Sequence, residues 1–93
     1  MSQWTPCKRL DFISRLRRLG FDGPFSGTRH QFMVYKQCRM AITSNSEYSI
    51  PQLLMLIRET EEITNREITV DVWDSLQMTA RQFEKVLIGF SAG

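Results

Sequence analysis

The sequence predicts an α+β fold in which one helix precedes three short antiparallel strands and a second helix follows them. Two observations predict the helices, because apolar side chains recur every three or four residues before Gly20 and again after Ser49. A third predicts the strands, because residues 30–36 form a run of β-branched and aromatic side chains. The chain has 93 residues, of which 42% are hydrophobic, so it is long enough for one modest core.

The first helix is expected to begin with Thr5 as N-cap and Pro6 at the first helical position. Gly20 is expected to end it with a left-handed C-cap, and residues 22–24 to form a turn. The apolar stripe of this helix is predicted to consist of Leu10, Ile13, Leu16 and Leu19, with Phe12 beside them.

Three strands are expected to follow and to pair as a small antiparallel meander. Phe25 is assigned to a short first strand, residues 30–36 to a second and residues 39–43 to a third, with a tight turn near residues 37–38. In this layout both helices can lie on one face of the sheet and leave the other face exposed.

The second helix has a predicted N-terminus at Ser49, with Gln52 completing a capping box and Tyr48 packing against Leu53 as a hydrophobic staple. Its buried stripe is expected to consist of Ile50, Leu53, Leu54 and Ile57. Its polar end is expected to carry Glu59, Glu61 and Glu62.

After Asn65 the chain repeats the same capping pattern. Thr69 is expected to cap a short helix over residues 69–76, although the alternation of Ile68, Val70 and Val72 also fits a strand. A further helix is predicted over residues 79–89, with Phe83, Val86, Leu87 and Phe90 on one face. We therefore expect residues 1–65 to form the domain, and residues 66–93 to form a helical extension packed on the same core.

The net charge of +2 conceals an asymmetry between the two halves. Residues 1–40 carry +6 and residues 41–93 carry −4. Clustered basic side chains are typical of phosphate-binding surfaces, and Arg17 and Arg18 on the first helix are candidates, although a solvated helix face has the same pattern. Two distant cysteines and one histidine give no zinc-site spacing, and no stretch is apolar enough to cross a membrane, so a cytoplasmic protein without metal or cofactor is expected.

His30 is the single histidine of the sequence, and it stands where a glycine-initiated turn becomes a strand. Histidine titrates near neutral pH, so His30 is a candidate for proton transfer beside Arg29. The alternative is an ordinary half-exposed strand residue.

The segment "LRRLGF" at residues 16–21, the segment "GTRHQF" at residues 27–32 and the helix after the strands resemble the HicA (YcfA-like) family of small toxins. The resemblance covers about residues 8–62. It implies an α-β-β-β-α fold like that of double-stranded-RNA-binding domains, here followed by short C-terminal helices.

The resemblance also implies function: a toxin that cleaves mRNA without a metal ion, uses His30 as its catalytic residue and is held inactive by a HicB-like antitoxin. Arg29 and Lys36 are expected to act as electrostatic partners. Gly27 is expected to let the RNA backbone approach, and Thr28 to bind phosphate or to close the turn.

The chain departs from the family pattern where Asn45 stands at about the position of a second histidine. A non-catalytic RNA- or protein-binding module of the same fold is therefore the alternative. An interaction protein with Trp4, Trp73 and Met78 on its surface is a third possibility. The acidic segment of residues 59–93 is either an elaboration of the fold or a cover over the basic face.

Overall fold

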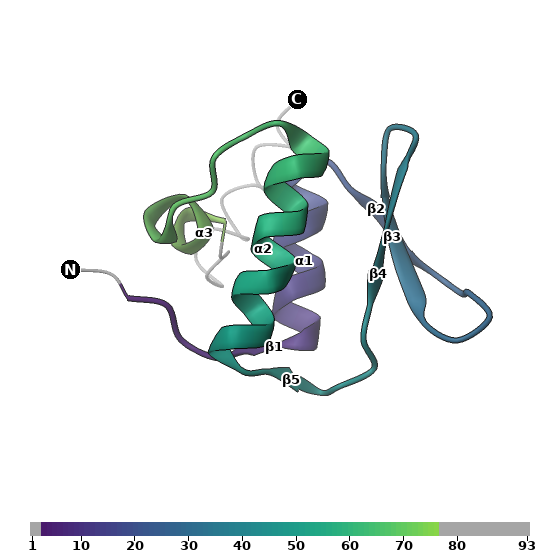
Figure 1. Cartoon of the computed structure of the whole chain (residues 1–93), viewed down its shortest axis with the longest axis horizontal. Coiled ribbons are helices and arrows are strands. Elements are labelled where there is room, and N and C mark those ends of the chain that lie inside the picture. Colours follow the sequence, from purple (N-terminus) through teal and green to yellow (C-terminus); the bar gives the residue numbers. More distant parts are fainter. Residues whose placement is uncertain (1–2, 77–93) are drawn as a thin grey trace, which may run out of the picture.

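The computed structural model describes residues 3–76, which form an α+β fold (Figure 1). The elements in chain order are β1 (Cys7–Lys8), α1 (Arg9–Leu19), β2 (Asp22–Phe25), β3 (Gln31–Tyr35), β4 (Cys38–Ile42), β5 (Glu47–Tyr48), α2 (Ile50–Thr64) and α3 (Val70–Ser75). No helix in this described part is long and apolar enough to span a bilayer.

The strands form two antiparallel sheets, a three-stranded sheet in the order β2-β3-β4 and a two-stranded sheet of β1 and β5. Helix α1 contacts β2 and helix α2 contacts β4, and both lie on one side of the three-stranded sheet, with their buried residues in one core; α3 lies on the other side of this helix pair (Figure 1). The order helix, three strands, helix is therefore confirmed, and within residues 3–76 one face of the sheet carries no helix.

The core lies between the helices and the sheet and continues under α3. Met33 and Met40 are opposite each other in the β3–β4 ladder, and both are fully buried. Because strand side chains alternate between faces, their neighbours Phe32 and Arg39 belong to the outward face. The remaining buried apolar residues are Cys7, Phe12, Ile13, Leu16, Leu19, Phe21, Ile42, Tyr48, Leu53, Leu56, Ile57, Ile68 and Trp73.

The first helix begins later than the sequence predicted. Helix α1 starts at Arg9 with Lys8 as N-cap, and the side chain of Lys8 makes no capping hydrogen bond. The prediction of Thr5 as N-cap is wrong because Cys7 and Lys8 instead pair with β5. This pairing joins residues 39 and 41 positions apart in the sequence, which local capping signals cannot reveal.

Both predicted apolar stripes are shifted on their helices. Leu10 is 77% exposed, because it lies about 200° around the helix from Phe12, the residue on which the buried face is centred. Leu54 is 37% exposed because it lies about 100° around the helix from Leu53, on which the buried face of α2 is centred, and Ile50, in the first turn, is 36% exposed. That face consists of Leu53, Leu56, Ile57, Thr60 and Thr64.

The boundaries of β3 and β4 differ from the prediction by one residue, and the turn between these strands lies at Lys36 and Gln37. Lys36 has a positive φ of 54°, so it belongs to the turn and not to the strand. Residues 22–24, predicted as a turn, lie in β2, with a register shift between Asp22 and Phe25. An edge strand tolerates the proline within it because one side of its backbone makes no ladder bonds.

The N-caps predicted at Ser49 and Thr69 are confirmed. Ser49 Oγ accepts from the backbone N–H of Gln52 at 3.4 Å, and Thr69 Oγ1 accepts from that of Val72 at 3.2 Å. Residues 70–75 are thus helical, and the alternative strand is wrong. Trp73 is 2% exposed, so it cannot form a partner surface. The helix predicted over residues 79–89, and Met78, lie outside the described residues.

Candidate functional site

His30 lies at the end of an exposed loop that connects β2 to β3. Residues 26–30 are all exposed, so the imidazole of His30 is accessible to a large substrate. This position differs from the half-exposed strand residue considered above, because β3 begins one residue later, at Gln31.

Gly27 has a structural reason to be glycine. A Cβ atom at this position would overlap the backbone carbonyl oxygen of His30. The loop therefore closes on itself at Gly27, with Thr28 and Arg29 at its tip and His30 at its end. Four of the seven predicted site residues thus share one short loop.

The other three predicted site residues lie elsewhere. Lys36 follows the far end of β3 from His30, about 20 Å away at 3.3 Å per strand residue. Arg17 and Arg18 are in the last turn of α1, and an Nη1–H of Arg18 donates to the carbonyl of Leu76 at 2.9 Å. The structure therefore places Arg29 beside His30, but not Lys36, Arg17 or Arg18.

A polar network that the sequence did not predict lies behind the His30 loop. Arg9, the first residue of α1, donates from Nε to the carbonyl of Thr43 at 3.1 Å and from Nη2 to Oε1 of Gln31. Gln31 directly follows His30 and opens β3. Arg9 thus ties the start of α1 to the strand next to the loop, across 22 residues of sequence for one contact and 34 for the other.

Thr43 is the centre of this network. Its carbonyl also accepts from the hydroxyl of Tyr48 at 2.8 Å, and its Oγ1 accepts from Nε2 of Gln52 at 3.1 Å. Gln52 Nε2 also lies 3.4 Å from Oδ1 of Asn45. Gln52 therefore contributes its backbone to the Ser49 cap but directs its side chain to the β4–β5 connection, so the reciprocal half of the predicted capping box is absent. Asn45 is turned toward the start of α2.

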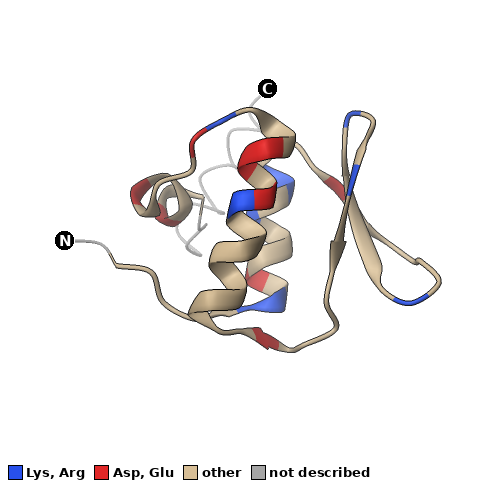
Figure 2. Cartoon of the chain, viewed as in Figure 1, with Lys and Arg blue, Asp and Glu red and all other residues tan. Residues whose placement is uncertain are grey.

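Charge is distributed unequally between the two sides of the molecule. Arg29 lies in the loop between β2 and β3 and Lys36 in the turn between β3 and β4, so basic residues stand at both ends of the three-stranded sheet. Acidic residues gather on the last turns of α2 and on α3 (Figure 2). Because α3 lies beyond the helix pair, its acidic residues do not cover the sheet. Instead, the backbone carbonyls of Trp73 and Leu76, in and just after α3, accept hydrogen bonds from Arg15 and Arg18 of α1.

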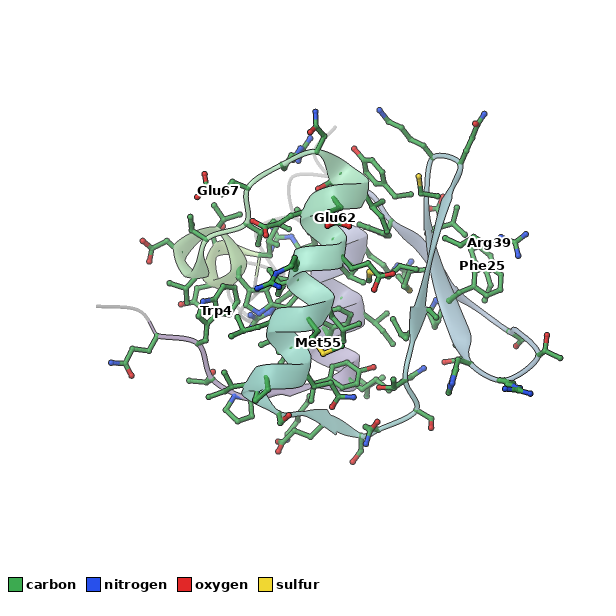
Figure 3. All side chains as sticks on the ribbon, in the orientation of Figure 1. Trp4, Phe25, Arg39, Met55, Glu62 and Glu67 are labelled. Carbon is green, nitrogen blue, oxygen red and sulfur yellow. The ribbon has the colours of Figure 1, made fainter. Side chains whose placement is uncertain are left out.

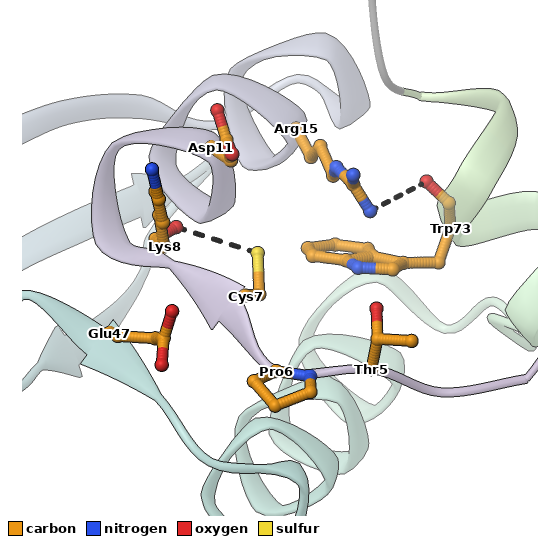
Figure 4. A pocket seen from close by; sticks show the side chains of 8 residues that line it. All are labelled: Thr5, Pro6, Cys7, Lys8, Asp11, Arg15, Glu47 and Trp73. Carbon is orange, nitrogen blue, oxygen red and sulfur yellow. Dashed lines mark hydrogen bonds between the residues drawn. The ribbon is translucent and has the colours of Figure 1, made fainter.

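A separate pocket of about 310 Å³ lies where β1, α1, β5 and α3 meet (Figure 4). The guanidinium of Arg15 lies 5.0 Å from the centre of the Trp73 ring and donates to the Trp73 carbonyl. Burial raises the pKa of the Cys7 thiol, and the charge of Arg15 opposes this rise. His30 does not line this pocket, whose charged residues are Lys8, Asp11, Arg15 and Glu47.

Metal-ligating side chains are dispersed. Within residues 3–76, no three histidine, cysteine, aspartate or glutamate side chains are grouped so that they could hold a metal ion. Comparisons with protein-family models, with curated proteins and with solved structures gave no match.

Proposed function

We propose that this chain is a metal-independent ribonuclease toxin of the HicA/HicB type, with His30 as its catalytic residue. The observation that carries the proposal is the His30 loop, which presents an exposed imidazole beside Thr28 and Arg29 and is closed at Gly27. A protruding loop fits a polymer such as RNA, whereas a small substrate requires a concave site.

The chemistry requires few groups. In RNA cleavage without a metal, a base takes the proton of the 2′-hydroxyl, the 2′-oxygen attacks the phosphorus, and the departing 5′-oxygen receives a proton. His30 can fill one of these two proton-transfer roles in a given step. Arg29 stabilises the negative charge that develops on the phosphoryl oxygens, and Thr28 offers a hydroxyl to the phosphate.

The architecture supports the same proposal. The order α1-β2-β3-β4-α2, with both helices on one side of the sheet, is the order that a fold like that of double-stranded-RNA-binding domains requires. We accordingly propose this fold, mRNA as substrate, a HicB-like antitoxin as partner and the cytoplasm as location.

RNA binding without cleavage is the second candidate, and the position of Asn45 favours it. Asn45 stands where a second histidine would fall and directs its amide oxygen toward Gln52. Lys36 is also at the far end of β3, so Arg29 remains as the predicted cation beside His30. A protein with one imidazole and one arginine at the loop can bind phosphate whether or not it cleaves.

Replacing His30 with alanine separates the two candidates. His30→Ala should abolish growth arrest and RNA cleavage, because it removes the proton-transfer group while deleting an exposed side chain with little packing. Ser26→Ala in the same loop is the matched control and should remain active. Equal cleavage by wild type and His30→Ala would reject the catalytic role, and RNA binding without cleavage by wild type would establish the second candidate.

A further inference from the structure

The outward face of the three-stranded sheet carries a cluster of aromatic and basic side chains that is separate from the His30 loop. Phe25 and Phe32 are partners across β2 and β3, and their ring centres are 5.6 Å apart. The guanidinium carbon of Arg39 lies 4.9 Å from the centre of the Phe32 ring. Figure 3 shows Phe25 and Arg39 on the side of the sheet that faces away from the helices.

These side chains line a shallow groove of about 410 Å³ along β3. The groove is lined by Phe25, Phe32, Val34, Lys36, Gln37 and Arg39. Within the described part of the chain, its lining contains two cations and no carboxylate, and Asp22, opposite Val34 in the ladder, is not part of it. Its charge is therefore complementary to a polyanion.

The aromatic content of the groove narrows the kind of polyanion. Phe25 is 45% exposed, which leaves a large apolar ring surface in water beside a second ring. Exposed aromatic side chains interleaved with basic ones on an antiparallel sheet are a platform on which unpaired bases stack, while the cations contact the backbone. Bases in a duplex are already stacked on one another and cannot use such a platform.

We propose that this groove binds single-stranded RNA, with a base stacked on Phe25 and with Arg39 and Lys36 on the backbone phosphates. The groove extends along β3 between the Lys36 turn and Phe32, and Phe32 is two residues from His30. A single-stranded RNA lying in this groove therefore reaches the His30 loop. The inference rests on the proposed function, since binding in the groove would bring RNA to His30. It also explains why Lys36 lies far from His30: Lys36 contacts the same RNA further along.

The groove can be tested without catalysis. The probe is a single-stranded RNA of about 12 nucleotides, a length within the range that single-strand-binding folds cover, with every 2′-hydroxyl methylated so that it cannot be cleaved. Phe25→Ala should weaken its binding to the full chain about tenfold, the equivalent of about 1.4 kcal/mol, because one stacking surface is removed. Arg39→Gln should weaken binding and reduce its salt dependence.

Matched controls are available on the helical side of the molecule. Met55→Ala also removes an exposed apolar side chain, 73% exposed on α2, and Arg58→Gln removes an exposed positive charge from the same helix. Both should bind the probe like wild type. A 2-aminopurine base in the RNA should lose fluorescence on binding to wild type and much less on binding to Phe25→Ala, which reports stacking directly.

The outcomes separate this inference from the proposed function. If wild type cleaves RNA and Phe25→Ala binds and cleaves equally well, the groove proposal is wrong while the role of His30 stands. If the groove variants lose binding but wild type does not cleave, the groove stands without the catalysis. The groove would be overturned as a single-strand site if wild type preferred duplex RNA of the same length. It would also be overturned if Phe25→Ala and Arg39→Gln lost binding to a protein partner but bound RNA as wild type does.

Discussion

Trp73 allows a quantitative test of how α3 is held on the rest of the molecule. Its side chain is 2% exposed and lies against the ring of Phe12, with ring centres 5.5 Å apart, and under the guanidinium of Arg15. Replacing a buried tryptophan with alanine typically costs about 3–5 kcal/mol, the sum of lost transfer free energy and the cavity left behind. The whole domain is expected to have a free energy of unfolding of about 5–15 kcal/mol.

Trp73→Ala should therefore lose about a fifth or more of the free energy of unfolding. Urea unfolding followed by far-ultraviolet circular dichroism measures this loss, since the signal comes mainly from the backbone and remains when the indole is removed. Val72→Ala is the matched control, because Val72 lies on the same helix and is 40% exposed, and its effect should be within about 0.5 kcal/mol.

Trp73→Phe keeps an aromatic ring at the site, so it should lose less free energy of unfolding than Trp73→Ala. It can still be measured if the alanine variant does not fold. A change below about 1 kcal/mol for Trp73→Ala would show that α3 does not pack on α1. Truncation after Asn65 also removes Ile68 and the carbonyls that accept from Arg15 and Arg18, so it should destabilise the protein at least as much.

Three further predictions follow from the loop and the thiols. Gly27→Ala should displace the His30 loop and lower RNA cleavage about ten- to a hundredfold, with a change below about 1 kcal/mol in the free energy of unfolding; unchanged cleavage would contradict the geometry of the loop. Arg29→Gln should reduce the slope of log affinity for RNA against log salt by about one unit, and Arg18→Gln, whose guanidinium is engaged by Leu76, should reduce it less; a salt-independent isotherm would reject phosphate contacts. Exposed Cys38 should react with a thiol reagent as a free thiol, whereas buried Cys7 should react only as fast as the chain opens, and equal reaction rates would contradict this burial. Because burial raises the pKa of Cys7 in the folded state, its contribution to stability should be full below the pKa of the unfolded chain and be lost as pH rises through the pKa of the folded protein.

Elements with strong local signals could be predicted from the sequence. Ser49 and Thr69 each accept a hydrogen bond from the backbone three residues later, so the signal lies within one turn of helix. Gly20 likewise adopts the left-handed φ of 114° expected of a C-cap glycine. The α+β class and the meander follow from such local signals and from the run of β-branched and aromatic side chains over residues 30–36.

Contacts between distant segments could not be predicted. The pairing of Cys7 with Tyr48 moved the start of α1, and nothing near Thr5 encodes it. The contact of Arg9 with Gln31 and Thr43 depends on how α1 crosses the end of the sheet, since the periodicity alone places Arg9 on a polar face. In the candidate site, the sequence located the His30 loop. The predicted strand over residues 30–36 already separates Lys36 from His30 by the length of a strand, and the structure confirms this separation.

The same helix connects the part of the molecule that carries stability to the part that carries the proposed chemistry. The middle and C-terminal end of α1 hold α3 through Phe12, Arg15 and Arg18, whereas its first residue, Arg9, contacts the start of β3 beside His30. Trp73 therefore lies on one side of the helix pair and the His30 loop beyond the other (Figure 1). Substitutions at sites without shared partners add in free energy, so the loss of stability in Trp73→Ala should be the same in the wild-type and His30→Ala backgrounds. Coupling between them would mean that α1 transmits the packing of α3 to the loop through Arg9.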